Sequence, residues 1–62
     1  MFVRPRTGDL VEVEPGWMHA GKIGMVMRSD PNDGMVRVLL QGDRRVEFIY
    51  LHMLIVLSRG EA

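Results

Sequence analysis

The sequence predicts an all-β domain, a small barrel of five short strands. Apolar and polar residues alternate with a period of two, and turn residues interrupt the alternation at short intervals. A chain of 62 residues supports one domain, and a domain of this size buries only about 60% of the surface that its unfolded chain exposes. Closing the sheet into a barrel would remove its exposed edges. We assign one domain to residues 1–62, with a core over about 8–58 and tails at 1–7 and 59–62.

Turn residues delimit each expected strand. The first strand starts at Asp9 and stops at Pro15, and the loop SDPNDG separates the second strand from the third. The pair GD turns the chain before the fourth strand, and residues 51–53 form one 3₁₀ turn before the last. The expected strands are 9–14, 22–29, 35–41, 44–50 and 54–57.

The apolar segment 46–57 has two interpretations. Leucine and methionine are good helix formers, so a helix is the alternative there. The segment is also rich in β-branched and aromatic residues, which favour strands, and we therefore expect strands.

Alternation also selects the expected core. In the first strand, Val11 and Val13 share one face and Glu12 lies on the other. The expected core consists of Val11, Val13, Ile23, Val26, Val36, Val38, Leu40, Val46, Phe48, Leu54 and Val56. Gly24 interrupts the second strand, and we interpret it as the bend that lets this strand curve across the first, because glycine inside a strand marks a bend, a bulge or a close approach.

Composition excludes several classes of protein. Eight basic and eight acidic residues balance, so the broad positive field of a typical nucleic-acid-binding protein is absent. With no cysteine and two histidines, we expect neither a disulfide framework nor a metal site. The few hydroxyl side chains have no neighbouring base, and side chains fill the interior of a small barrel, so we expect no enzyme and no cofactor.

Hydrophobic patterning argues against membrane insertion and export. The longest apolar run, residues 48–57, is much shorter than the roughly 20 residues that a membrane helix needs. The first ten residues lack the apolar stretch of a signal peptide. We therefore expect a cytoplasmic protein with no membrane partner.

The segment from Gly8 to Asp30 resembles the KOW motif, whose outline is Gly-Asp-x-Val-x-Val, a loop with glycine, and then Gly-Lys-x-Gly-x-Val. The matching positions are Gly8, Asp9, Val11, Val13, Gly16, Gly21, Lys22, Gly24 and Val26. The whole chain is also similar to small SH3-like proteins encoded by bacteriophages, mainly in its ending. These resemblances imply an SH3-like barrel, contact with RNA or a large nucleoprotein machine, and, for a phage protein, a place in the host cytoplasm or the virion.

The loop EPGWMHAG departs from KOW proteins that bind RNA, because it carries Glu14 and an apolar centre where those proteins carry several lysines. An exposed indole is typical of a contact surface, and Tyr50 with His52 could stack a base or a peptide. The expected partner-binding residues are Trp17, Met18, Tyr50 and His52. Trp17 could instead close an open barrel end as a lid, and His52 could simply cap a turn.

Basic residues supply the alternative function, binding of RNA or single-stranded nucleic acid. Arginine pairs with phosphate through a rigid fork. The candidate nucleic-acid-binding residues are Lys22, Arg28, Arg37, Arg44 and Arg45. Asp43 and Glu47 lie close to the arginines in sequence, so cross-strand ion pairs on a solvated face are the competing interpretation.

Apolar residues on both faces of the expected strands predict self-association. A barrel of this size can bury only one set, and a contiguous apolar patch on a protein surface usually marks an interface. The expected self-association residues are Leu10, Met25, Met27, Met35, Leu39 and Ile49. A tail with Phe2 and Val3, or Leu57, could cover this face instead. We expect a homo-oligomer and a further protein partner, with a two-fold dimer the commonest closed form.

Overall fold

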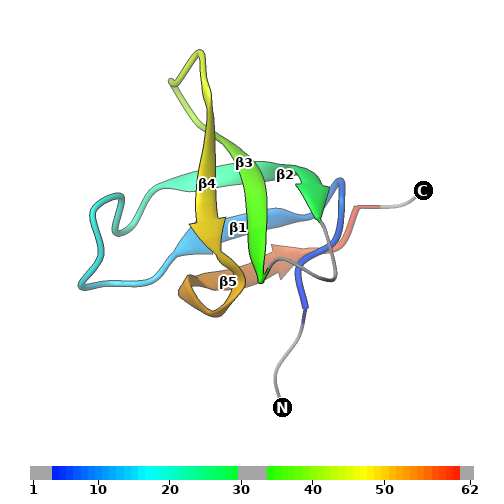
Figure 1. Cartoon of the computed structure of the whole chain (residues 1–62), viewed down its shortest axis with the longest axis horizontal. Coiled ribbons are helices and arrows are strands. Elements are labelled where there is room, and N and C mark those ends of the chain that lie inside the picture. Colours follow the sequence, from blue (N-terminus) through cyan, green and yellow to red (C-terminus); the bar gives the residue numbers. More distant parts are fainter. Residues whose placement is uncertain (1–3, 30–33, 61–62) are drawn as a thin grey trace.

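The structure is a computed structural model of the chain that describes residues 4–29 and 34–60. It is all-β, as predicted, and the segment 46–57 forms no α-helix. The elements, in chain order (Figure 1), are β1 (Leu10–Val13), β2 (Ile23–Ser29), β3 (Met35–Leu40), β4 (Val46–Tyr50), the 3₁₀ helix η1 (Leu51–Met53) and β5 (Leu54–Ser58). Most of the predicted turn SDPNDG lies outside the described residues, as do Phe2 and Val3.

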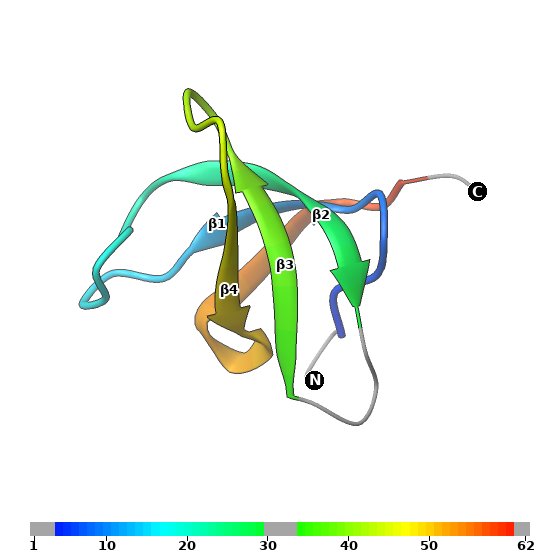
Figure 2. The ribbon, with the colours of Figure 1, turned by 45° about the horizontal axis from the view of Figure 1, so that its top comes forward.

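The five strands form one antiparallel sheet in the order β4-β3-β2-β1-β5. β2 curves, so that β3 and β4 run across the direction of β1 and β5 (Figures 1 and 2). β4 and β5 are the two ends of the sheet, and no ladder joins them in the described part of the chain. The all-β sheet is therefore confirmed, and the closed barrel stays a prediction.

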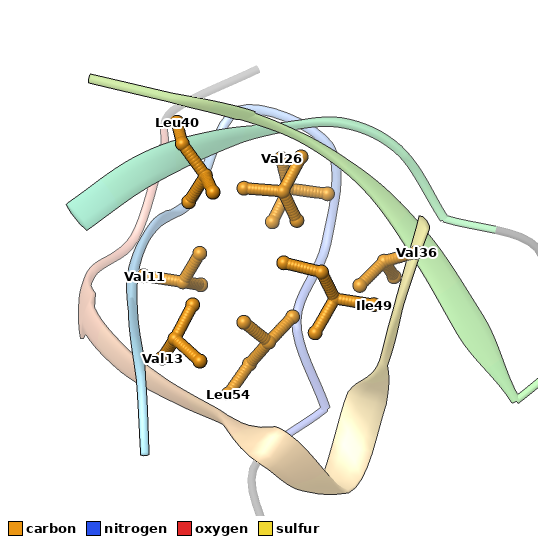
Figure 3. Packing of buried hydrophobic residues seen from close by; sticks show 8 residues of the cluster. Val11, Val13, Val26, Val36, Leu40, Ile49 and Leu54 are labelled. Carbon is orange, nitrogen blue, oxygen red and sulfur yellow. The ribbon is translucent and has the colours of Figure 1, made fainter. Parts of the chain in front are cut away.

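The core lies inside the curved sheet and is built from small branched side chains (Figure 3). Every strand contributes to it, because each presents alternate residues inward. The buried apolar residues are Val11, Val13, Val26, Val36, Val38, Leu40, Ile49 and Leu54. Val56 packs against this cluster and is only partly buried.

Three predicted core residues lie outside the core. Ile23, Val46 and Phe48 are 37%, 42% and 62% exposed, whereas Ile49, which we expected outside, is only 6% exposed. In β4 the prediction chose the wrong face, because both faces are apolar and alternation alone cannot distinguish them. The ladder decides the face: Ile49 pairs with buried Val36, and a shift of one residue exchanges the two faces of a strand.

Gly24 allows β2 to approach β3 closely. It is buried, and it pairs with Val11 of β1 on one side and Leu40 of β3 on the other. A Cβ atom at this position would lie 2.6 Å from the carbonyl oxygen of Leu39 and 2.8 Å from a methyl carbon of Val38. The close approach of β3 thus explains a glycine inside this strand.

Asp9 is a buried carboxylate that joins the segment before β1 to the segment after β5. Its side chain is 1% exposed and accepts hydrogen bonds from the backbone N–H of Arg6, the backbone N–H of Gly60 and the guanidinium of Arg59, each 2.9 Å long. We call these four residues the Asp9 clamp. Burial by itself raises the pKa of Asp9, but the three donors outweigh burial and hold the pKa below its ordinary value of 3.8.

Candidate functional site

An aromatic cleft lies between the β1–β2 loop and β4. Its volume is about 290 Å³. Part of its wall is formed by Val13, which belongs to the core, and by Met53, which packs against the core. The lining residues are Val13, Trp17, Met18, His19, Glu47, Phe48, Ile49, Tyr50 and Met53.

The rings of Trp17 and Tyr50 line this cleft, and both contact the ring of His52, which is not one of the lining residues. Tyr50 stacks on His52 with ring centroids 5.6 Å apart and planes inclined by 24°. Trp17 and His52 form a T-shaped pair, with ring centroids 6.4 Å apart and planes inclined by 76°. The structure thus brings together the expected partner-binding residues, with Met18 88% exposed beside them. Trp17 keeps 46% of its surface exposed.

Successive turns fix the loop that carries Trp17. The N–H of Ala20 donates to the carbonyl of Trp17 at 2.9 Å, and the N–H of Lys22 donates to that of His19 at 3.0 Å. At the base of the loop, Val13 and its neighbours continue the ladder between β1 and β2. Because its backbone is bonded internally, the loop can present the indole in a defined place without burying it.

The chemistry of the cleft is apolar with one negative charge. Glu47 is the only acidic side chain among its lining residues, and no lysine or arginine lines it. No group of three possible metal ligands occurs among residues 4–29 and 34–60. Sequence reasoning missed Glu47 and Phe48 as site residues, because it placed the wrong face of β4 toward the core.

The basic residues do not form one site. Arg28 and Arg37 pair across β2 and β3, and Arg37 lies over the ring of Phe48, 5.2 Å from its centroid. Arg44 and Arg45 are exposed in the turn between β3 and β4, and Lys22 is exposed beside β2. In the described part of the chain, no ion pair joins these arginines to Asp43 or Glu47, so the expected cross-strand ion pairs do not form.

Four apolar side chains form a continuous row on the outside of the sheet, which we call the outer row. Leu10 pairs with Met25, Met25 with Leu39, and Leu39 with Val46. Three of the four were expected at the self-association face; Val46 had been assigned to the core. Met27 is also exposed and Met35 half-buried. The assignment of Ile49 to this face is wrong, because its side chain is in the core.

Comparisons with the models of known protein families, with curated proteins and with solved structures gave no match. The resemblance to KOW-motif proteins and to phage-encoded SH3-like proteins therefore stays a prediction from the sequence. Across residues 4–29 and 34–60, no helix has the length and apolar character needed to span a membrane.

Proposed function

We propose that this chain is a small non-enzymatic binding module of the SH3-like kind, which holds a short segment of a partner protein in the aromatic cleft. The proposal depends on the exposure of three rings around one cleft: Trp17 is 46%, Tyr50 48% and Phe48 62% exposed. Large apolar surfaces are unfavourable in water unless a partner covers them. Tryptophan and tyrosine also dominate the residues that contribute most to protein interfaces.

Charge and size favour a peptide segment as the ligand. The carboxylate of Glu47 repels phosphate and attracts a lysine or arginine of a partner. A volume of about 290 Å³ is at the lower limit of the roughly 300–1,000 Å³ of small-molecule sites. The cleft therefore suits a few side chains of an extended segment better than a large cofactor.

Selection from a random library of short displayed peptides tests the function. We expect peptides that quench or shift the fluorescence of Trp17, and whose affinity falls about tenfold or more with Tyr50→Ala. The matched control is Leu57→Ala, which removes an exposed apolar side chain of β5 that does not line the cleft. Failure to select any peptide, or equal losses in both variants, would overturn the proposal.

Single-stranded nucleic acid is the second candidate ligand. It is favoured by Arg28 and Arg37, which lie opposite each other without a carboxylate partner in the described part of the chain, and by the contact of Arg37 with Phe48. Proteins of this class combine arginines with exposed rings on which bases stack. Binding of a mixed-sequence oligonucleotide should then weaken steeply with added salt, because phosphate contacts release counterions, whereas peptide binding in the apolar cleft should weaken little.

We propose that a second copy of the chain covers the outer row. The row is bordered by Arg28 and Arg37 on one side and by Glu12, two positions from Leu10 in β1, on the other. A two-fold axis along the row would bring the arginines of one copy toward Glu12 of the other, so the face is complementary to itself in charge as well as apolar.

Light scattering during size-exclusion chromatography tests this association. We expect a dimer at high micromolar concentration and a monomer for the double variant Met25→Glu with Leu39→Lys. The matched control Met18→Glu changes an exposed residue of the β1–β2 loop outside the row and should leave the dimer intact. A monomeric wild-type protein under these conditions would refute the interface.

A further inference from the structure

The aromatic cleft lies at the edge of a strand rather than over one face of the sheet. Four consecutive residues of β4, from Glu47 to Tyr50, line it. Consecutive residues of a strand point alternately to opposite faces, and here Ile49 points into the core while Phe48 is 62% exposed. A cleft lined by residues of both faces lies beside the strand, next to its backbone.

The edge of β4 beside the cleft is unpaired. β4 is the last strand of the sheet and forms a ladder with β3 on one side only. In the described part of the chain, no other strand or loop forms a backbone hydrogen bond with the opposite side of β4. This edge can therefore accept a further strand.

The direction of the backbone groups follows from one hydrogen bond. The N–H of Leu51 donates to the carbonyl of Gly34, 2.9 Å away, so it points toward β3. Backbone groups of alternate residues point to the same side of a strand. The N–H and C=O of Glu47 and Ile49 therefore point toward β3, and those of Phe48 point away from it, toward the cleft.

Side-chain geometry supports this assignment independently. Phe48 and Arg37 are directly opposite each other in the β3–β4 ladder. Residues that are opposite but do not exchange hydrogen bonds have their side chains closer together. The guanidinium of Arg37 lies 5.2 Å from the centre of the Phe48 ring, as expected for such a pair.

We propose that an extended segment of a partner protein adds to the edge of β4 as a sixth strand, bonded to the N–H and C=O of Phe48. This proposal rests on the proposed function and specifies its mode. An added strand lies about 4.8 Å from its neighbour, which places it in the cleft between β4 and the loop of Trp17. Its apolar side chains contact Trp17 and Tyr50.

Charge defines one further feature of the segment. Glu47 lines the cleft without an ion-pair partner in the part of the chain that the structure describes. A segment with lysine or arginine among its apolar residues would supply this partner. A proline-rich segment in the polyproline II conformation is a different occupant, because it packs on rings without forming a ladder.

Amide hydrogen exchange on the full chain tests the mode of binding, with a peptide from the library selection as the probe. We expect the amide of Phe48 to exchange about tenfold or more slowly when the peptide is saturating. The amide of Ile49 is the internal control, since it is already bonded to β3 and should change much less. This alternation between neighbouring residues is specific to an added strand.

A pair of variants gives a second measurement. Phe48→Ala and Phe48→Pro both remove the ring, but only proline also removes the N–H, which the β3–β4 ladder does not use. We expect the peptide to bind Phe48→Pro about tenfold more weakly than Phe48→Ala. Circular dichroism shows whether the proline variant is folded. If it is not, the exchange experiment on the unmodified protein decides whether the peptide adds to the edge of β4.

The outcomes separate this inference from the proposed function. A peptide that needs Tyr50 but leaves the Phe48 amide unprotected would overturn strand addition and leave the binding function intact. Selected peptides of the polyproline II type would have the same meaning. If no peptide binds, both proposals fail.

Discussion

The side chains near the two ends of β1 differ in how far other groups of the same chain bind or cover them. Just before β1, the buried carboxylate of Asp9 accepts hydrogen bonds from three groups of its own chain. Beyond the other end of β1 lies the β1–β2 loop (Figure 1). Trp17 of this loop and Tyr50, which lines the same cleft, leave nearly half of their surfaces in water. The difference distinguishes side chains that stabilise the fold from side chains that remain available to a partner. We therefore expect substitutions in the Asp9 clamp to change stability, and substitutions of the exposed rings to change binding.

Asp9→Ala should cause the largest loss of stability among the variants that test this comparison. It removes the acceptor of three hydrogen bonds, from the N–H groups of Arg6 and Gly60 and from the guanidinium of Arg59. A hydrogen bond to a charged group contributes about 1.5–3 kcal/mol. We expect the free energy of unfolding in urea to fall by about 3 kcal/mol. For 62 residues the total is on the order of 3–9 kcal/mol, so much of the stability would be lost.

The control for this variant is Asp43→Ala, which removes a carboxylate that forms no ion pair in the described part of the chain. It should change the free energy of unfolding by less than about 0.5 kcal/mol. Equal effects of the two substitutions would show that the Asp9 clamp does not stabilise the fold.

Gly24→Ala should cause the next largest loss of stability. It tests how closely β3 approaches β2 in the sheet. The added methyl group would overlap the carbonyl of Leu39, which belongs to the backbone and cannot turn aside. We expect a loss of about 2 kcal/mol in the free energy of unfolding, in the range measured for overpacked cores. Ile23→Ala changes the other neighbour of Gly24, which is exposed and lies outside the outer row, and should cost less. Similar losses would mean that the approach of β3 is not tight.

Strand positions could be predicted from the sequence, because proline, glycine and aspartate mark the turns and alternation marks the strands between them. Trp17 and Tyr50 could be assigned to the same partner-binding set, because an indole in a loop is typical of a contact surface and a tyrosine near a histidine can stack on a ligand. Glu47 and Phe48 could not be assigned to this site from the sequence, because the register of β4 with β3 decides which of its residues face the core. The Asp9 clamp could not be predicted either, since Gly60 is 51 residues away in sequence and local patterns do not reveal such a contact.

The pH dependence of stability should identify the Asp9 clamp specifically. The folded-state pKa of Asp9 lies below its ordinary value of 3.8, so its ionised form stabilises the fold above that pH. This contribution is lost as the pH falls below 3.8 and through the lower folded-state pKa. We expect Asp9→Asn, measured by urea unfolding from neutral to acid pH, to lose less stability on acidification than the wild type. Parallel curves would mean that the carboxylate does not gain stability from its partners.

Trp17→Ala should change stability less than Asp9→Ala or Gly24→Ala, although it removes the largest side chain of the loop. The indole is 46% exposed, and its one aromatic contact in the described part of the chain is a T-shaped pair with His52, with ring centroids 6.4 Å apart. Such a pair is worth about 0.5–1.5 kcal/mol. We expect the free energy of unfolding to fall by no more than about 1 kcal/mol, whereas binding of a selected peptide should be lost.

Val13→Ala is the matched control, because Val13 lines the same cleft from the core side and is 1% exposed. Removing its two methyl groups should cost about 2 kcal/mol and leave the rings in place. Val13→Ala should thus mainly lower the free energy of unfolding, and Trp17→Ala should mainly abolish peptide binding, although both residues line the cleft. A loss above about 2 kcal/mol for Trp17→Ala would place the indole among the core residues and remove the distinction between the two ends of β1.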